Sequence, residues 1–223
     1  MDETRVTRRG SLLKLGGAGI AAALGWKAVD EASGAGPAAV ASGAVSCVLT
    51  PEQTEGPYFL PGDNVRRDVR EGKPGALLTL KLTVLDVSTC RPIKGAAVDI
   101  WHCDATGNYA ATSNKTFMRG IQKTDAKGVA TFKTVYPGWY QGRTVHIHVK
   151  VSLGGNVVHT GQLYFPDSTT DKVYTRSPYS SRPGRTTRNP DDSIYRNGGG
   201  RSTLKLKKVG SAYTGSITMG VQR

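Results

Sequence analysis

The sequence has no apolar run long enough for a membrane-spanning helix, and it contains few acidic, aromatic, cysteine and histidine residues. Its 223 residues include 17 acidic side chains against 30 basic ones, 3 cysteines, 4 histidines and 7% aromatics. A spanning helix needs about 20 apolar residues, so we expect no stable membrane insertion. The net charge of +13 allows anionic partners, but the absence of regularly spaced aromatic stacking platforms argues against nucleic acid binding.

The N-terminus has the pattern of an export signal. Arg8 and Arg9 precede the small-residue run LGGAGIAAALGW, and Ala39-Val40-Ala41 offers a cleavage site before Ser42. We therefore predict a twin-arginine signal peptide over residues 1–41, one mature domain over residues 42–223, and an exported, extracellular protein. The alternatives are an N-terminal helix of the domain and a retained membrane anchor.

The three cysteines fit an exported protein with one disulfide and one free thiol. Cys90 lies in the turn after one predicted strand, and Cys103 lies near the end of the next strand. The sequence thus favours the pair Cys90–Cys103, while Cys47 with either partner stays open.

Alternating apolar and polar residues between Gly, Pro, Asn and Asp turns predict an all-β fold. We expect one antiparallel β-sandwich with long irregular surface loops. An irregular arm precedes its strands, a polar segment over residues 167–200 follows the sixth strand, and a hairpin closes the chain. The predicted strands are 76–86, 96–104, two within 120–136, 142–151, 157–166, and the hairpin 202–221.

The stretch GRTVHIHVKV, residues 142–151, is the most informative part of the sequence. As a strand it turns the valines and Ile147 to one face, and His146, His148 and Lys150 to the other. The two histidine Cα atoms then lie about 6.6 Å apart, which allows both imidazoles to bind one metal ion.

Two tyrosines accompany these histidines: Tyr109 in a Gly-x-Tyr loop and Tyr140 in a Pro-Gly-x-Tyr turn. With these motifs the chain resembles the intradiol ring-cleaving catechol dioxygenases. The resemblance runs from Thr50 to Pro166, and the export signal and cysteines are similar to those of the family's secreted branch. It rests on the segments TPEQTEGPYF, DIWHCDATGNYA, TVYPGWYQGRTVHIHVKV and GQLYFP.

The resemblance implies a non-haem iron(III) ion held by Tyr109, Tyr140, His146 and His148. Anionic phenolate oxygen stabilises this hard, highly charged ion. The implied substrates are catechols and O2, and the implied products are cis,cis-muconate-type diacids. The family pattern further implies that Tyr140 leaves the metal and accepts a catechol proton.

The same resemblance assigns roles to four further residues. Arg143 would stabilise an electron-rich ring, although a strand continuing through Thr144 would point it away from the histidine face. Gln162 would lie near the ligands, and Pro57 and Tyr58 would line the substrate pocket. Trp101 fits a core position better than a pocket wall.

Two other functions fit parts of the pattern. A transthyretin-like, non-enzymatic secreted β-sandwich binding module would explain the Gly-rich turns but needs neither His146 nor His148. A zinc hydrolase would use those two with His102 as ligands and Asp104 as base, but it leaves the tyrosines unexplained. The sequence gives no oligomeric state, and residues 172–223 carry 11 basic and 2 acidic side chains of no evident function.

Overall fold

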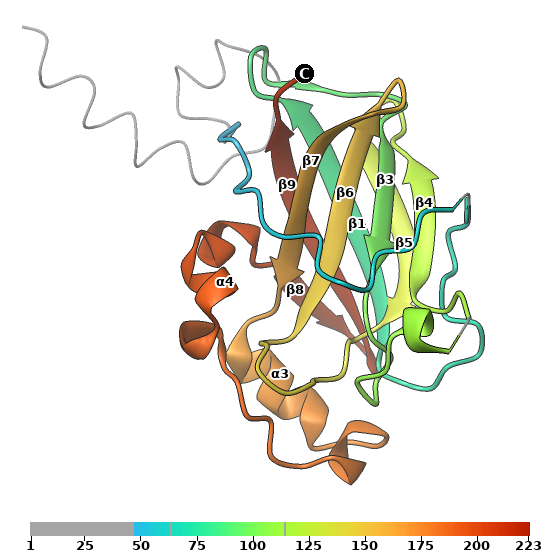
Figure 1. Cartoon of the computed structure of the whole chain (residues 1–223), viewed down its shortest axis with the longest axis vertical. Coiled ribbons are helices and arrows are strands. Elements are labelled where there is room, and N and C mark those ends of the chain that lie inside the picture. The colour runs from blue at the N-terminus through green and yellow to red at the C-terminus, as the bar shows by residue number, and fades with distance from the viewer. Residues whose placement is uncertain (1–46, 63, 114) are drawn as a thin grey trace, which may run out of the picture.

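Two β-sheets pack face to face in the computed structural model, which describes residues 47–62, 64–113 and 115–223 (Figure 1). The signal peptide predicted over residues 1–41, together with residues 42–46, lies outside this part. In the described part no helix is long and apolar enough to cross a membrane.

One sheet has five strands and the other has four. The five-stranded sheet joins β2, β1, β9 and β8 in that order, and β5 also pairs with β1. The four-stranded sheet has the order β4-β3-β6-β7. The strands are β1 (Leu77–Asp86), β2 (Arg91–Pro92), β3 (Ala97–Trp101), β4 (Arg119–Lys123), β5 (Val129–Val135), β6 (His146–Leu153), β7 (Asn156–Tyr164), β8 (Lys205–Val209) and β9 (Ala212–Val221).

The predicted all-β sandwich is confirmed, with two differences in its connections. All strand pairs are antiparallel except β1 with β9, which run parallel. The two strands predicted around Asp125–Gly128 exist, but β4 belongs to one sheet and β5 to the other. The turn between them therefore crosses the sandwich instead of closing a simple hairpin.

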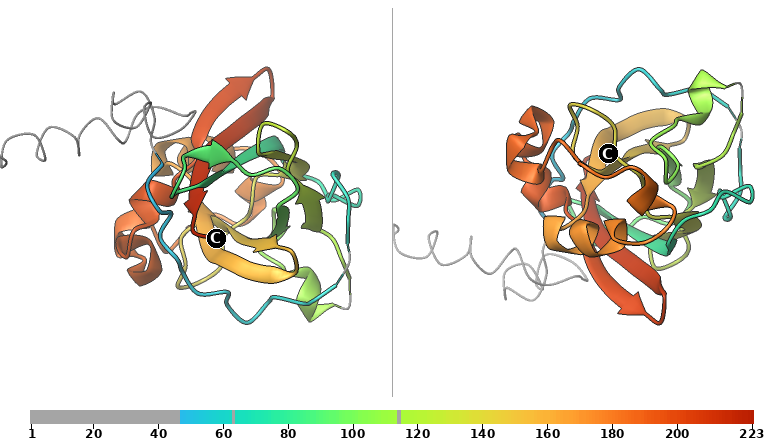
Figure 2. Two further views of the ribbon diagram at one scale, coloured as in Figure 1. Left: turned by 90° about the horizontal axis from the view of Figure 1, so that it is seen from above. Right: turned by 90° about the horizontal axis from the view of Figure 1, so that it is seen from below.

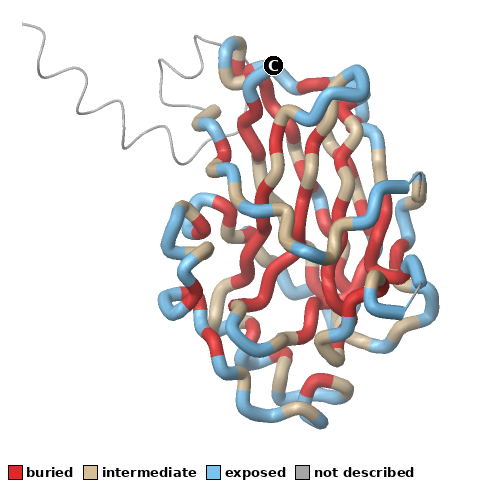
Figure 3. The backbone as a smooth tube through the Cα atoms, in the orientation of Figure 1, coloured by how far each residue is buried: buried red, intermediate tan, exposed pale blue. Residues whose placement is uncertain are grey.

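The main core lies between the sheets, and β6 shows how the sequence builds it. Val145, Ile147, Val149 and Val151 are all buried in this core cluster. Their alternation with polar residues places the other side chains of β6 on the outer face of the four-stranded sheet. Figure 3 shows the buried positions concentrated along the strands.

The segment after β7 forms several short helices instead of irregular coil. They are α3 (Asp167–Tyr174), η2 (Tyr179–Ser181), η3 (Asn189–Asp191), α4 (Ser193–Arg196) and η4 (Gly199–Ser202), and a further short turn, η1 (Ala110–Thr112), follows β3. Figure 2 shows these C-terminal helices grouped beside the sandwich, with the β8–β9 hairpin projecting from it.

The predicted arm before β1 runs across the outer face of the four-stranded sheet (Figure 1). Backbone hydrogen bonds fix it at intervals: Thr50 to Gly220 of β9, Gln53 to Thr160 of β7, and Arg66 to Ile121 of β4. This outer face is therefore covered and can bury polar side chains away from water.

Candidate metal centre

His146 and His148 meet on the covered outer face of β6. Their Nε2 atoms lie 3.1 Å apart, and both side chains are buried. The Nδ1–H of His146 donates to the Thr144 carbonyl at 2.7 Å, which leaves the Nε2 lone pair directed into the site. The His148 ring stacks on Trp101 with 4.9 Å between centroids and 8° between planes. Trp101 is thus buried as expected, but it packs behind a site residue and not in the main core.

The loop after β3 supplies Tyr109. Asp104 shapes this loop because its Oδ1 accepts hydrogen bonds from the Thr106 amide, the Thr106 hydroxyl and the Asn108 amide. These turn contacts end the strand at Trp101, earlier than the predicted residue 104.

The loop after β5 supplies Tyr140 and lies directly against the Tyr109 loop. The Gly138 amide donates to the Asp104 carbonyl at 2.9 Å. A Cβ at Gly138 would lie 2.5 Å from the Ala105 oxygen, and one at Gly107 would lie 2.3 Å from the Trp139 oxygen. Both positions therefore need glycine, since only glycine allows the two loops to approach this closely.

The four donor atoms converge on one point. His146 Nε2 lies 3.1 Å from Tyr140 Oη and 3.5 Å from Tyr109 Oη. Donor atoms bound to a common metal at about 2.1 Å lie about 3.0–3.4 Å from one another. The described residues hold no group of three or more His, Cys, Asp or Glu arranged for a metal. A metal here must therefore use the tyrosines, and the set fits a hard cation such as iron(III).

Burial keeps the four donors neutral when no cation is near. It raises the pKa of Tyr109 well above its usual value and that of Tyr140 to about 12. Burial also lowers the pKa of His146 to about 3, helped by the Arg143 charge, and that of His148 well below its usual value. Neutral imidazoles are ready to bind a metal, whereas the phenols need a strong positive charge to ionise.

The predicted catalytic pair, Arg143 and Gln162, lies beside these donors. Arg143 lies before the start of β6 at His146. The alternation of side chains along the strand therefore does not turn Arg143 away from the histidine face. Its Nη2 donates to Gln162 Oε1 at 2.5 Å. Gln162 faces His148 across the β6–β7 ladder and donates from Nε2 to the Thr54 carbonyl of the arm at 3.0 Å.

The arm brings Pro57 and Tyr58 to the rim of the site. The Tyr58 ring stacks on Tyr109 with centroids 4.2 Å apart and planes 18° apart. Pro57 is exposed, and the preceding Gly56 lies so close to His148 that a Cβ there would be 3.1 Å from its ring. Tyr58 therefore forms a wall of the site, while Pro57 lies at its edge.

The predicted disulfide Cys90–Cys103 is wrong. Cys90 pairs with Cys47, with Cα atoms 5.5 Å apart, and Cys103 is free and buried. The early end of β3 explains the difference: Cys103 turns under the Tyr109 loop, where its Sγ lies 3.4 Å from the Gly138 oxygen. The bond instead ties the start of the arm to the turn after β1.

The zinc alternative fails at His102. Its Nδ1 lies 2.7 Å from the Cys103 carbonyl, and its Nε2 lies 2.7 Å from the Thr134 hydroxyl. With both nitrogens engaged by neighbours, it cannot act as a third ligand beside the other two histidines. Asp104 is also occupied, by Lys73 and by its own loop.

Sequence reasoning missed Asp192, which lies in the segment after β7. This buried carboxylate accepts from Arg143 Nε and from the Thr144 amide, each at 2.8 Å. The sequence did indicate a local role for this residue, because an Asp directly before SIYR is a favoured N-cap of a short helix. Nothing in the sequence linked that cap to a residue about 50 positions earlier.

Comparison with known proteins identifies the class. A family model described as "Dioxygenase" matches residues 54–181. The structure of an intradiol ring-cleavage dioxygenase from Tetranychus urticae is 34% identical, with a TM-score of 0.76, and the match covers 79% of this chain and 95% of that one. The chain therefore belongs to the intradiol ring-cleavage dioxygenases, a family of enzymes, and not to the non-enzymatic alternative.

Two further relatives support this family assignment. The dioxygenase domain of a dioxygenase carbohydrate-binding protein fusion from Streptomyces sp. SirexAA-E is 33% identical, with a TM-score of 0.61, and the match covers 77% of this chain and 97% of that one. A chlorocatechol 1,2-dioxygenase from Rhodococcus opacus is 27% identical over 143 residues, 54% of this chain and 55% of that protein. The chain spans about half the length of the curated relatives that it matches.

Proposed function

We propose that this chain is a non-haem iron(III) enzyme that uses O2 to cleave catechol-type rings between their hydroxyl-bearing carbons, giving cis,cis-muconate-type diacids. The observation that carries the proposal is the convergence of the two phenol oxygens and His148 Nε2 on His146 Nε2, each within 3.5 Å of it. Similarity to proteins named catechol and chlorocatechol 1,2-dioxygenase supports a catechol substrate.

Tyr109, Tyr140, His146 and His148 would hold the metal. Bound iron(III) would supply a Lewis acid that draws electron density from a catecholate and prepares its ring for O2. The protein contributes rigid support for the donors, because Trp101 stacks on His148 and the two touching loops hold the tyrosines. Such support keeps the donors in place before substrate arrives.

The two tyrosines have different surroundings and, we infer, different roles. Tyr109 is buried beneath Tyr58, whereas Tyr140 is only partly buried. Tyr140 is therefore the tyrosine that a catechol can approach, and in its phenolate form its Oη would accept a proton from a catechol hydroxyl. Arg143 places a positive charge beside the ring and stabilises negative charge as it develops.

The test is the visible absorption spectrum of the purified protein, measured together with its iron content. We expect a red-brown colour from tyrosinate-to-iron(III) charge transfer, a shift of the band when catechol is added without oxygen, and a muconate-type product when oxygen is admitted. A protein that stays colourless after iron reconstitution contradicts the proposal. Assays with catechol and protocatechuate compare neutral and carboxylated rings, which the basic surface would attract unequally.

We further propose that the protein is exported by the twin-arginine route and belongs to the family's secreted branch. The Cys47–Cys90 disulfide supports this, because such bonds persist in oxidising compartments. Replacing Arg8 and Arg9 by lysine should retain the protein in the cytoplasm. Equal export of this variant and the natural chain would contradict the proposal.

A further inference from the structure

Asp192 is a buried carboxylate whose hydrogen bonds connect the C-terminal segment to the metal centre. Its side chain is 1% exposed. Oδ2 accepts from Arg143 Nε and the Thr144 amide at 2.8 Å, while Oδ1 caps α4 by accepting from the amides of Ile194 at 2.8 Å and Tyr195 at 3.1 Å. Each carboxylate oxygen therefore accepts two hydrogen bonds, which compensates for the burial of the charge.

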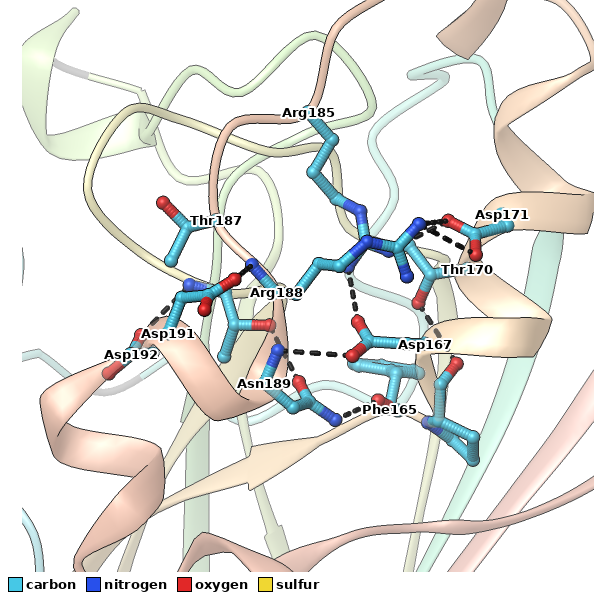
Figure 4. Close-up of polar contacts among 12 residues, drawn as sticks. Phe165, Asp167, Thr170, Asp171, Arg185, Thr187, Arg188, Asn189, Asp191 and Asp192 are labelled. Atoms are coloured by element: carbon cyan, nitrogen blue, oxygen red, sulfur yellow. Dashed lines mark hydrogen bonds and ion pairs between the residues drawn. The ribbon is translucent and has the colours of Figure 1, made fainter.

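A network of charged residues holds the backbone that carries Asp192 (Figure 4). Arg185 bridges Asp167 and Asp171 of α3 at 2.5 and 2.7 Å, and Arg188 reaches Asp171 at 3.1 Å. Asp167 also accepts from the Asn189 amide at 3.1 Å. These contacts tie the stretch before Asp192 to the helix that follows β7.

Asn189 makes the second connection between this segment and β6. Its Nδ2 donates to the Phe165 carbonyl at 2.9 Å, and its Oδ1 accepts from the Thr144 hydroxyl at 2.6 Å. Thr144 is thus held by Asn189 through its side chain and by Asp192 through its amide. The residues that lead into the histidine strand are positioned by the C-terminal segment and not by the strand alone.

The consequence for Arg143 is a fixed guanidinium. Asp192 holds Nε, and Gln162 holds Nη2 at 2.5 Å. Gln162 is itself held by the arm through Thr54, and Tyr164 donates toward its Oε1 at 3.1 Å. An arginine side chain is long and flexible, so two fixed nitrogens on different partners define the direction of its charge.

We propose that Asp192 is the positioning residue for Arg143, and that orienting this arginine beside the substrate ring is the function of the segment 167–200. The proposal rests on the proposed ring-cleaving function. The other interpretation is that Asp192 only caps α4, in which case its loss would destabilise the segment without acting through Arg143. The two interpretations differ in whether the effects of Asp192 and Arg143 are coupled.

A double-mutant cycle with Asp192→Asn and Arg143→Ala separates them. We expect Asp192→Asn to lower kcat about 10- to 100-fold, the usual loss when an orienting partner is removed, with the iron content and the visible band unchanged. In the Arg143→Ala background the same change should lower kcat less than twofold, because the residue it positions is gone. If the loss of kcat in the double variant equals the product of the two single-variant losses, the proposal is overturned.

A second readout needs no metal. In metal-free protein labelled with 15N-arginine, the Nε–H of Arg143 should exchange slowly with water, and its signal is assigned by its loss in Arg143→Lys. Asp192→Asn should accelerate this exchange at least tenfold. Arg188→Ala, which removes an exposed contact of the network, should change it less than twofold. Equal exchange in Asp192→Asn and the natural protein would contradict the proposal.

The two proposals fail in different ways. If the natural protein, loaded with iron, cleaves no catechol, then the proposed function fails, whatever the Arg143 exchange shows. If it cleaves catechol and Asp192→Asn is equally active, then ring cleavage stands and the positioning role is wrong.

Discussion

The two faces of strand β6 use the same backbone for different purposes. The inner face carries Ile147, Val149 and Val151 into the core between the sheets. The outer face carries His146 and His148 under a cover made from the arm, two loops and the C-terminal segment. The inner face therefore depends on one local pattern, whereas the outer face depends on residues brought from distant parts of the chain.

The largest expected effect comes from His148→Ala on the outer face. It removes one of the four converging donors, so iron affinity should fall more than about 100-fold, since loss of a mere supporting residue already costs 10- to 100-fold. Ring cleavage and the visible band should disappear with the iron. The measurement is iron content after dialysis, with Tyr213→Phe as the control because that tyrosine belongs to the main core cluster and not to the aromatic cluster at the site. Retention of one iron per chain in His148→Ala would remove it from the ligand set.

The sequence predicted the inner face and the grouping of the four candidate donors better than it predicted the residues that support them. Alternation identified β6, and the family resemblance carried by four sequence segments implied that Tyr109 and Tyr140 lie beside the histidines. Asp192 could not be found this way, since its contact with Arg143 spans 49 positions and exists only after α3 and α4 have packed. The Cys90–Cys103 prediction failed for a related reason: it assumed a longer β3, and the Asp104 turn ends that strand early.

Ile147, which lies between the two histidines but on the inner face of β6, provides the opposite test. Ile147→Ala on the inner face should lower the free energy of unfolding by about 2–5 kcal/mol, because it leaves a cavity in a closely packed core. The folded fraction should still bind iron and show the charge-transfer band. Chemical denaturation measures the change, and Val157→Ala, at a position 56% exposed, is the matched control with a small effect. Loss of the band from fully folded Ile147→Ala protein would show that the two faces are not independent.

The cover of the outer face is tested by removing the Cys47–Cys90 disulfide. This bond links residues 43 apart and holds the beginning of the arm. Replacing both cysteines by serine should lower the free energy of unfolding by about 2–4 kcal/mol, chiefly by freeing the unfolded chain. Activity at 25 °C should persist, since Gln53, Arg66 and Val69 hold the later part of the arm by backbone hydrogen bonds. Complete loss of activity in folded double variant would show that the cover depends on the bond.

The smallest effect is expected at the far end of the arm, where Asp68 pairs with Arg70 at 2.6 Å. The Arg70 hydrogen bond lowers the pKa of Asp68 to about 2. A lowered carboxyl pKa stabilises the fold above the unfolded value of about 3.9 and loses that contribution as pH falls toward 2. Because the side chain is 46% exposed, solvent screening should limit the effect of Asp68→Asn to less than about 0.5 kcal/mol. Melting temperatures of the two proteins should differ slightly at pH 6 and converge near pH 2. A difference of several degrees at pH 6 would mean that surface charge, and not backbone pairing, secures the cover over the histidine face.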